Sequence, residues 1–112
     1  MSIKNHVSLT GNVGNKPELF TSEAGKNITK MSLATNETYK NEKGEKVTTT
    51  EWHNLVLFGN RAKLAAKYLN TGSLISVHGS LRTRKYDDKQ GVTKYITEIV
   101  VEDLLFLDNK PT

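Results

Sequence analysis

Two arginines and a tyrosine alternate in the second half of the chain, in the pattern Arg82-x-Arg84-x-Tyr86. Side chains alternate across a β-strand, so a strand here would place all three on one face. Guanidinium groups bind phosphates, and aromatic rings stack on unpaired bases. Bases that are free to stack belong to single strands, because those of a duplex are already stacked. The pattern therefore favours contact with a single-stranded nucleic acid.

A second group of aromatic residues lies in residues 48–58, a segment rich in Thr, Val, Leu and aromatic residues and therefore predicted to be a strand. One face of this strand is apolar and suited to a protein interior, and it comprises His53, Leu55 and Leu57. The other face comprises Trp52, Asn54, Val56 and Phe58. Large rings on an outward face indicate a contact surface. The alternative is that loops or another subunit cover them.

The charge of the chain is uneven. Sixteen Lys and Arg residues against twelve Asp and Glu residues give a net charge of +4. Residues 61–94 alone carry eight basic and two acidic residues, whereas residues 95–112 are net acidic. A basic stretch on a small domain indicates a polyanionic partner, most commonly nucleic acid. A solvated basic surface without a partner is the alternative interpretation.

Length and composition restrict the class of protein. With 112 residues, 36% of them hydrophobic, the chain is predicted to form one domain over residues 1–107, followed by a short C-terminal remnant at 108–112. Cysteine is absent, which excludes disulfides and fits a reducing cytoplasm. The sequence has neither an apolar run long enough to cross a membrane nor the apolar stretch of a signal peptide. We therefore expect a cytoplasmic protein without a membrane partner.

The three histidines, His6, His53 and His78, give little support for catalysis or metal binding. None belongs to an H-x-x-x-H pair or stands beside a nucleophile motif. The Gly-Asn-Val-Gly at residues 11–14 lacks the Lys-Ser/Thr of a phosphate loop. We therefore expect no enzymatic activity and no metal ion, nucleotide or other cofactor. His53 is expected to pack or to contact another subunit.

The hydrophobic periodicity predicts strands at residues 3–13, 18–22, 27–37, 48–58, 73–86 and 93–107, the first bent at a glycine. Residues 39–47 are polar around Gly44 and are expected to be a flexible loop, whereas residues 87–91 are predicted to be a hairpin turn. A helix is predicted between Asn60, its expected N-cap, and Gly72, its expected stop. With the short segments 18–22 and 27–37 counted together as the second strand, the order is three strands, a helix and two strands. This is the order of an all-β fold, the five-stranded OB-fold Greek-key barrel with one helix between strands 3 and 4.

Four stretches carry a family resemblance: V-S-L-T-G-N-V-G at residues 7–14, T-E-W-H-N-L-V-L-F-G at 50–59, Y-L-N-T-G-S at 68–73 and G-S-L-R-T-R-K-Y at 79–86. They resemble the bacterial single-stranded DNA-binding protein family (SSB), from about residue 3 to 107. Members are OB-folds that usually form homotetramers and wrap single-stranded DNA without sequence preference. The resemblance implies binding and protection of single-stranded DNA in replication, recombination and repair. It also implies a nucleoid-associated homotetramer, a dimer of dimers, in which the first strand is a candidate edge for pairing between subunits.

The resemblance also implies a set of DNA-binding residues, namely Tyr39, Trp52, Phe58, Arg82, Arg84, Lys85 and Tyr86. Trp52 and Phe58 match base-stacking positions of the family. Tyr39 and Tyr86 stand where stacking tryptophans are frequent, and a tyrosine offers less ring area. The three basic residues match positions that contact the DNA backbone. Asn54 replaces a residue that is often basic, which removes one phosphate contact.

The end of the sequence departs from the family pattern. Typical members continue into a Gly/Pro/Gln-rich tail whose acidic tip recruits replication and repair enzymes, whereas this sequence stops at Thr112. Such partners are therefore expected only if a longer tail exists outside this chain. The alternative function is a primosome-assembly or RNA-binding module related to SSB. That module need not keep exposed aromatic residues, so Trp52, Phe58 and Tyr86 favour single-stranded DNA binding.

Overall fold

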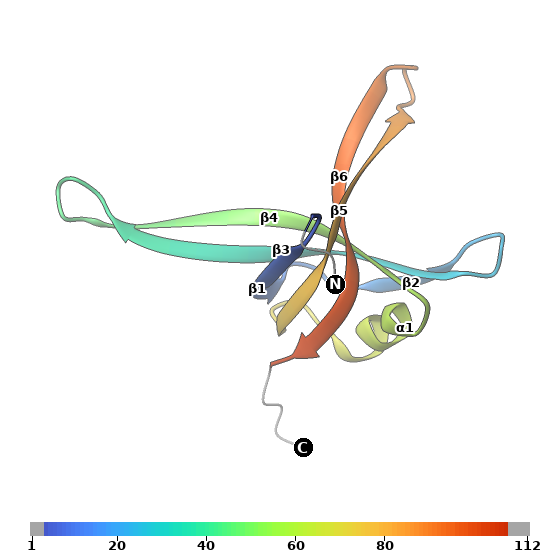
Figure 1. The fold of residues 1–112 in the computed structure, drawn as a ribbon, viewed down its shortest axis with the longest axis horizontal. Helices are drawn as coiled ribbons and strands as arrows, with labels where there is room; N and C mark the ends of the chain where they lie inside the picture. Colours follow the sequence, from blue (N-terminus) through green and yellow to red (C-terminus); the bar gives the residue numbers. More distant parts are fainter. Residues whose placement is uncertain (1–3, 108–112) are drawn as a thin grey trace.

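The strands form a six-stranded sheet that closes into a barrel (Figure 1), as seen in a computed structural model that describes residues 4–107. The elements are β1 (Val7–Val13), β2 (Glu18–Thr21), β3 (Asn27–Lys40), β4 (Lys46–Phe58), α1 (Gly59–Tyr68), β5 (Leu74–Asp87) and β6 (Thr93–Phe106). Five strands follow one another in the order β1-β5-β6-β4-β3, and the pairing of β1 with β3 closes the ring. The short β2 is added outside it, on β3. The predicted OB-fold barrel is confirmed, with α1 after the third strand of the ring.

The barrel closes where β1 changes partners. Asn12 is paired with Leu74 of β5 and also with Ala34 of β3. The preceding Gly11 is buried, and a Cβ at this position would collide with the backbone carbonyl of Ala34. The glycine predicted to bend the first strand therefore lies at the crossing between two neighbours. The strand itself begins only at Val7, and the predicted start at residue 3 lies outside the described residues, as does the predicted remnant at 108–112.

The hydrophobic core fills the barrel and extends beneath α1. It comprises mainly Val13, Leu33, Leu55, Leu57, Ile75 and Val77, with Ala62, Ala65 and Leu69 from the helical segment. The helix is also tied to the sheet by a buried hydrogen bond of 2.8 Å, which the Thr29 hydroxyl of β3 donates to the carbonyl of Ala62. This packing fixes the inward faces of β3 and β4, and so leaves their outward faces for other contacts.

Both predicted ends of the helix need correction. The N-cap is Phe58, in an extended conformation and without a side-chain capping bond, so the expected cap at Asn60 is wrong. Gly59 has a φ of 66°, in the left-handed region, which turns the chain sharply from β4 into α1. The helix ends at Tyr68, and Gly72 (φ 93°) belongs to the turn that follows rather than to the helix end.

Two hairpins project from the barrel (Figure 1): the β3–β4 arm, residues 36–50, and the β5–β6 arm, residues 81–98. The expected flexible loop at 39–47 is wrong, because β3 and β4 stay in unbroken register to the pair Lys40–Lys46. The Asn41 side-chain oxygen closes the turn by accepting hydrogen bonds of 2.9 Å from the backbone amides of Lys43 and Glu45. A polar sequence here reflects exposure on both faces, not lack of structure.

A register shift between β5 and β6 at His78 and Gly79 marks the point where the β5–β6 arm leaves the barrel. Such shifts bend a strand and interrupt its simple alternation. Leu81 follows the buried Ile75 and Val77 at even spacing but is exposed, because it lies beyond the barrel. Ser80 alternates with the exposed Arg82 and Arg84 but is buried, at the root of the arm.

Candidate nucleic-acid interface

Trp52 lies on the outward face of β4, at the root of the β3–β4 arm, and is 62% exposed. The small side chain of Ala34 stands opposite it on β3. On another side the indole ring lies against Gly14, where a Cβ would collide with the ring. Small neighbours thus let the ring lie against the sheet while much of its surface faces solvent. This is the geometry that base stacking requires.

Phe58 ends the same face of β4 and is 44% exposed. It lies six residues from Trp52 on one strand, which corresponds to about 20 Å. Val56 was expected on this outward face as well, but it is buried where β4 runs beside β6, in register with Val100. Two exposed rings therefore flank a central part of β4 that is partly covered.

A groove of about 280 Å³ lies where the outward face of β3 and β4 meets the root of the β5–β6 arm. Its lining comprises Asn15, Lys30, Met31, Ser32, Asn54, Leu55, Arg84, Ile96 and Glu98. Asn54 lies between Trp52 and Phe58 on β4, so the groove is placed between the two rings. Lys30 of β3 supplies a cation in the same groove as Asn54. Nothing in the sequence marks Lys30, because only the register of β3 on β4 brings it here.

Arg84 lines the groove and is held by Glu98 of β6. Its Nε donates a hydrogen bond of 2.8 Å to a carboxylate oxygen of Glu98, which is only 8% exposed. This hydrogen bond raises the pKa of the Arg84 guanidinium above its ordinary value. Because the bond uses Nε, a phosphate would be bound through the two terminal nitrogens. Glu98 thus orients the guanidinium and also offsets part of its charge.

Alternation along β5 separates the predicted residues. Arg82, Arg84 and Tyr86 alternate on one face of the β5–β6 arm, as expected from their spacing. Lys85 lies on the other face, where its cross-strand neighbour is the exposed Tyr95. The structure therefore groups Trp52, Phe58 and Arg84 around the groove, and it does not bring Lys85 to them.

Tyr39 also lies away from the groove. It is exposed near the end of the β3–β4 arm, opposite Val47. On β3 it is five residues from Ala34, the partner of Trp52, and an odd spacing puts the two on opposite faces of the ribbon. Nearby, His53 is half-buried with its Nε2 2.9 Å from the Thr35 hydroxyl, as expected for a packing residue.

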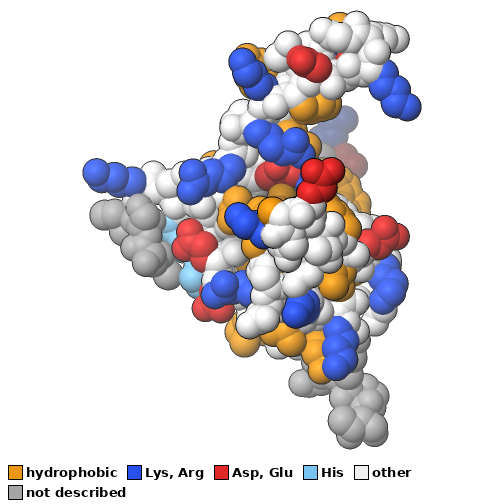
Figure 2. Space-filling model, turned by 90° about the vertical axis from the view of Figure 1, so that its right-hand side faces the viewer, with side chains coloured by type: hydrophobic (Ala, Val, Ile, Leu, Met, Phe, Trp, Pro, Cys, Tyr) orange, Lys and Arg blue, Asp and Glu red, His pale blue; other side chains and the backbone are white. Residues whose placement is uncertain are grey.

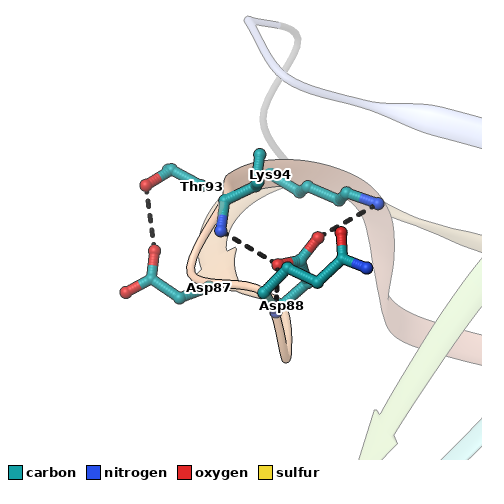
Figure 3. Close-up of polar contacts among 6 residues, drawn as sticks. Asp87, Asp88, Thr93 and Lys94 are labelled. Atoms are coloured by element: carbon teal, nitrogen blue, oxygen red, sulfur yellow. Dashed lines mark hydrogen bonds and ion pairs between the residues drawn. The ribbon is translucent and has the colours of Figure 1, made fainter.

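The tip of the β5–β6 arm is closed by a polar network (Figure 3). One carboxylate oxygen of Asp88 accepts 2.9 Å hydrogen bonds from the backbone amides of Gln90 and Val92. The other oxygen is 3.4 Å from the Lys94 ammonium. The bond from the Val92 amide is the main cause that lowers the pKa of Asp88 below its ordinary value of 3.8. This network fixes the end of the arm that carries Tyr86.

Positive charge is spread along the arm rather than gathered in one patch. Figure 2 shows Lys and Arg side chains on the projecting β5–β6 arm, and on the body below it basic, hydrophobic and acidic side chains interleaved. Interleaved rings and cations are typical of surfaces that bind single strands. Within residues 4–107, no helix is long and apolar enough to cross a membrane.

Comparison with known proteins places this geometry in a family. Residues 4–107 match the Single-strand binding protein family. A single-stranded DNA-binding protein of Rickettsia typhi is 43% identical over 95% of this chain and 74% of its own length. One of Xanthomonas campestris pv. campestris is 42% identical, over 95% of this chain and 62% of its own length. This chain therefore spans roughly three-fifths to three-quarters of these relatives.

A solved structure, described as a Plasmodium falciparum SSB complex with ssDNA, has the same fold. It superposes with a TM-score of 0.83 and 37% sequence identity, over 96% of this chain and 97% of that one. The fold and the sequence lead to the same conclusion, and this chain belongs to the single-strand binding protein family.

Proposed function

We propose that this chain binds single-stranded DNA without sequence preference, with bases stacked on Trp52 and Phe58 and the backbone held by Arg82 and Arg84. The observation that carries the proposal is the groove between the two exposed rings, with Arg84 in its lining. Rings accept any base, because every base has a stacking face, and guanidinium groups bind phosphates whatever the sequence. Tyr86 extends the row of Arg82 and Arg84 toward the tip of the arm.

Tyr39 and Lys85 would take part only where the DNA passes around an arm. Each lies on the face of its arm that is turned away from the residues at the groove. We therefore assign them a secondary role, in a strand that leaves the groove and wraps the hairpins. Residues 1–107 form the proposed binding domain, which acts without catalysis and without a cofactor.

Protection of single strands in replication, recombination and repair is the proposed cellular role, in the cytoplasm and at the nucleoid. Recruitment of replication and repair enzymes would depend on a segment outside this chain. The relatives named above extend beyond the part that this chain matches, in agreement with such an arrangement.

A homotetramer built from two dimers is the proposed assembly. One OB-fold offers a track of only about 4–16 nucleotides, so wrapping a longer strand needs several copies. In residues 4–107, the segment Val7–Thr10 of β1 pairs with β5 alone and presents its other edge without a strand partner. That edge can pair with a second copy. A sedimentation mass near four times 12.5 kDa at micromolar concentration is expected, and a mass near that of one chain would contradict the assembly.

The binding proposal is tested with the fluorescence of Trp52, the single tryptophan of the chain. Oligo(dT) is expected to quench it strongly, and a duplex of equal length is expected to leave it nearly unchanged. Binding should persist in EDTA. Quenching by RNA or by duplex at equal concentration, with none by oligo(dT), would instead favour the assembly or RNA-binding module.

A further inference from the structure

Phe20 is an exposed aromatic residue on β2 that the proposed function leaves unused. Its side chain is 47% exposed. On the four-residue strand β2, Phe20 is paired with the half-buried Ile28 of β3. Ile28 is itself paired with Phe58 of β4. Directly opposed residues of antiparallel strands share a face. Phe20, Ile28 and Phe58 therefore form one row across three strands, on the same side of the sheet as Trp52.

The geometry of this row suits two separate bases. Neighbouring strands lie about 4.8 Å apart, so Phe20 and Phe58, two strands apart, are separated by about 10 Å. Ile28 stands between them in the row, and both rings are exposed. The next row on the same face is Glu18, Lys30 and Val56. Lys30 thus lies one row from the rings on the same face, where its ammonium would be available to a phosphate between two stacked bases, while Glu18 lies farther out at the edge.

Packing of the protein itself does not explain the exposed ring. The adjacent Leu19 points to the other face, opposite Thr29, which is fully buried and bonded to α1. The face of β2 that is turned toward the core therefore carries Leu19 and not Phe20. Phe20 points to the side that carries Trp52 and Phe58.

We propose that Phe20 is a further base-stacking position, so that the DNA leaves β4 at Phe58 and continues across the sheet to the edge strand β2. This inference rests on the proposed binding of single-stranded DNA. It lengthens the track on each subunit toward the β2 edge, in a direction that crosses the strands.

The first test compares Phe20→Ala with Leu19→Ala, a matched control on the same strand with 42% exposure but the opposite face. Affinities are measured with fluorescently labelled oligo(dT) of increasing length. Loss of one stacked base is expected to weaken binding of long oligonucleotides about 5-fold or more. Because Leu19 lies on the other face, the Kd of Leu19→Ala should stay within about 2-fold of that of the native protein. Phe20→Leu, which keeps an apolar side chain but removes the ring, should behave like Phe20→Ala.

The second test reads contact directly. The chain has three phenylalanines, Phe20, Phe58 and Phe106. With 4-fluorophenylalanine at all three, the ¹⁹F resonances of Phe20 and Phe58 should shift on addition of oligo(dT). The resonance of Phe106, whose ring lies 6.3 Å from that of Tyr68, should stay in place.

Each outcome has a distinct meaning. A shift at Phe58 without one at Phe20, together with native affinity of Phe20→Ala, would overturn the inference and leave the proposed function intact. A change of sedimentation mass in Phe20→Ala with unchanged DNA affinity per chain would also overturn it, because Phe20 would then be a contact between copies. If the native protein fails to bind oligo(dT), the proposed function itself is wrong, and the inference falls with it.

Discussion

The two arms end in turns of the same kind but differ in the chemistry of their side chains. In the β3–β4 arm the side-chain oxygen of Asn41 accepts hydrogen bonds from the second and fourth following amides, and Gly44 has a φ of 79°. In the β5–β6 arm Asp88 makes the same two bonds, and Gly91 has a φ of 78°. The glycine adopts the left-handed backbone without strain, and the Asn or Asp side chain accepts the hydrogen bonds of the turn amides. The backbones of the arms are thus formed by the same local means.

The charges of the arms, in contrast, set them apart. Residues 36–50 carry three lysines and three glutamates, and so have no net charge. Residues 81–98 carry five basic and three acidic residues, a net +2. The first arm is held across its strands by neutral bonds, such as that from Thr50 to Asn36 at 2.6 Å. The second has a neutral bond of this kind between Thr83 and Thr97, and in addition the ion pairs of Arg84 with Glu98 and of Lys94 with Asp88. This difference supports the proposal that phosphates bind along the β5–β6 arm, whereas the β3–β4 arm contributes mainly the ring at its root.

The largest effect is expected from Trp52→Ala, which removes that ring. Loss of one stacked base should weaken binding by roughly 1–3 kcal/mol. Stacking displaces few ions, so the slope of log K against log salt should stay nearly unchanged. Anisotropy of a labelled oligo(dT) at four or five salt concentrations measures both quantities. Tyr95→Ala, which removes an exposed ring from the outer face of the other arm, is the control and should bind nearly as the native protein does.

A smaller effect of a different kind is expected from the double change Arg82→Ala, Arg84→Ala. Each phosphate contact on a single strand contributes about 0.7 to the salt slope, so the slope should flatten by about 1.4 per engaged subunit. The loss of affinity should shrink as salt rises. The control is Lys40→Ala, Lys43→Ala, which removes the same charge from the β3–β4 arm. If both pairs flatten the slope equally, the arms do not differ in function.

The ion pair on the β5–β6 arm predicts a modest gain. Glu98→Gln removes a negative charge beside the groove and keeps a hydrogen-bond acceptor for Arg84. Binding at low salt should tighten a few-fold, on the order of 1 kcal/mol or less, since the Arg84 side chain is half exposed and its pairing is screened. The same oligo(dT) titrations measure it. Weaker binding would mean that orientation of Arg84 by Glu98 outweighs the repulsion.

The smallest effect is expected at the turns, on acidification. Hydrogen bonds lower the folded-state pKa of Asp88 below 3.8, so the bonds of its carboxylate stabilise the turn fully above that value. This contribution is lost as the pH falls through the lowered pKa. Asn41 does not titrate in this range. Acid titration followed by NMR should therefore shift the amides of Gln90 and Val92 and spare those of Lys43 and Glu45. Parallel shifts in both turns would indicate general unfolding instead.

Much of the site could be predicted from the sequence because alternation along a strand is a local property. The period of two placed Trp52 and Phe58 on one face of β4, opposite the buried Leu55 and Leu57, before any pairing was known. The single helix and the order of strands followed from the same patterns. The boundaries were less accurate. Gly44 and its polar neighbours predict a flexible loop, whereas the structure has an ordered turn in which Gly44 adopts a φ of 79°.

Local periodicity therefore predicts the strands, the side of a strand on which a residue lies and the residue types there. The tertiary structure sets which faces meet. It placed Lys30 beside Asn54, joined Arg84 to Glu98 and aligned Phe20 with Phe58. Each of these relations depends on the register between strands, and register is set when segments far apart in the chain pair around a common core. Local periodicity carries no information about that pairing.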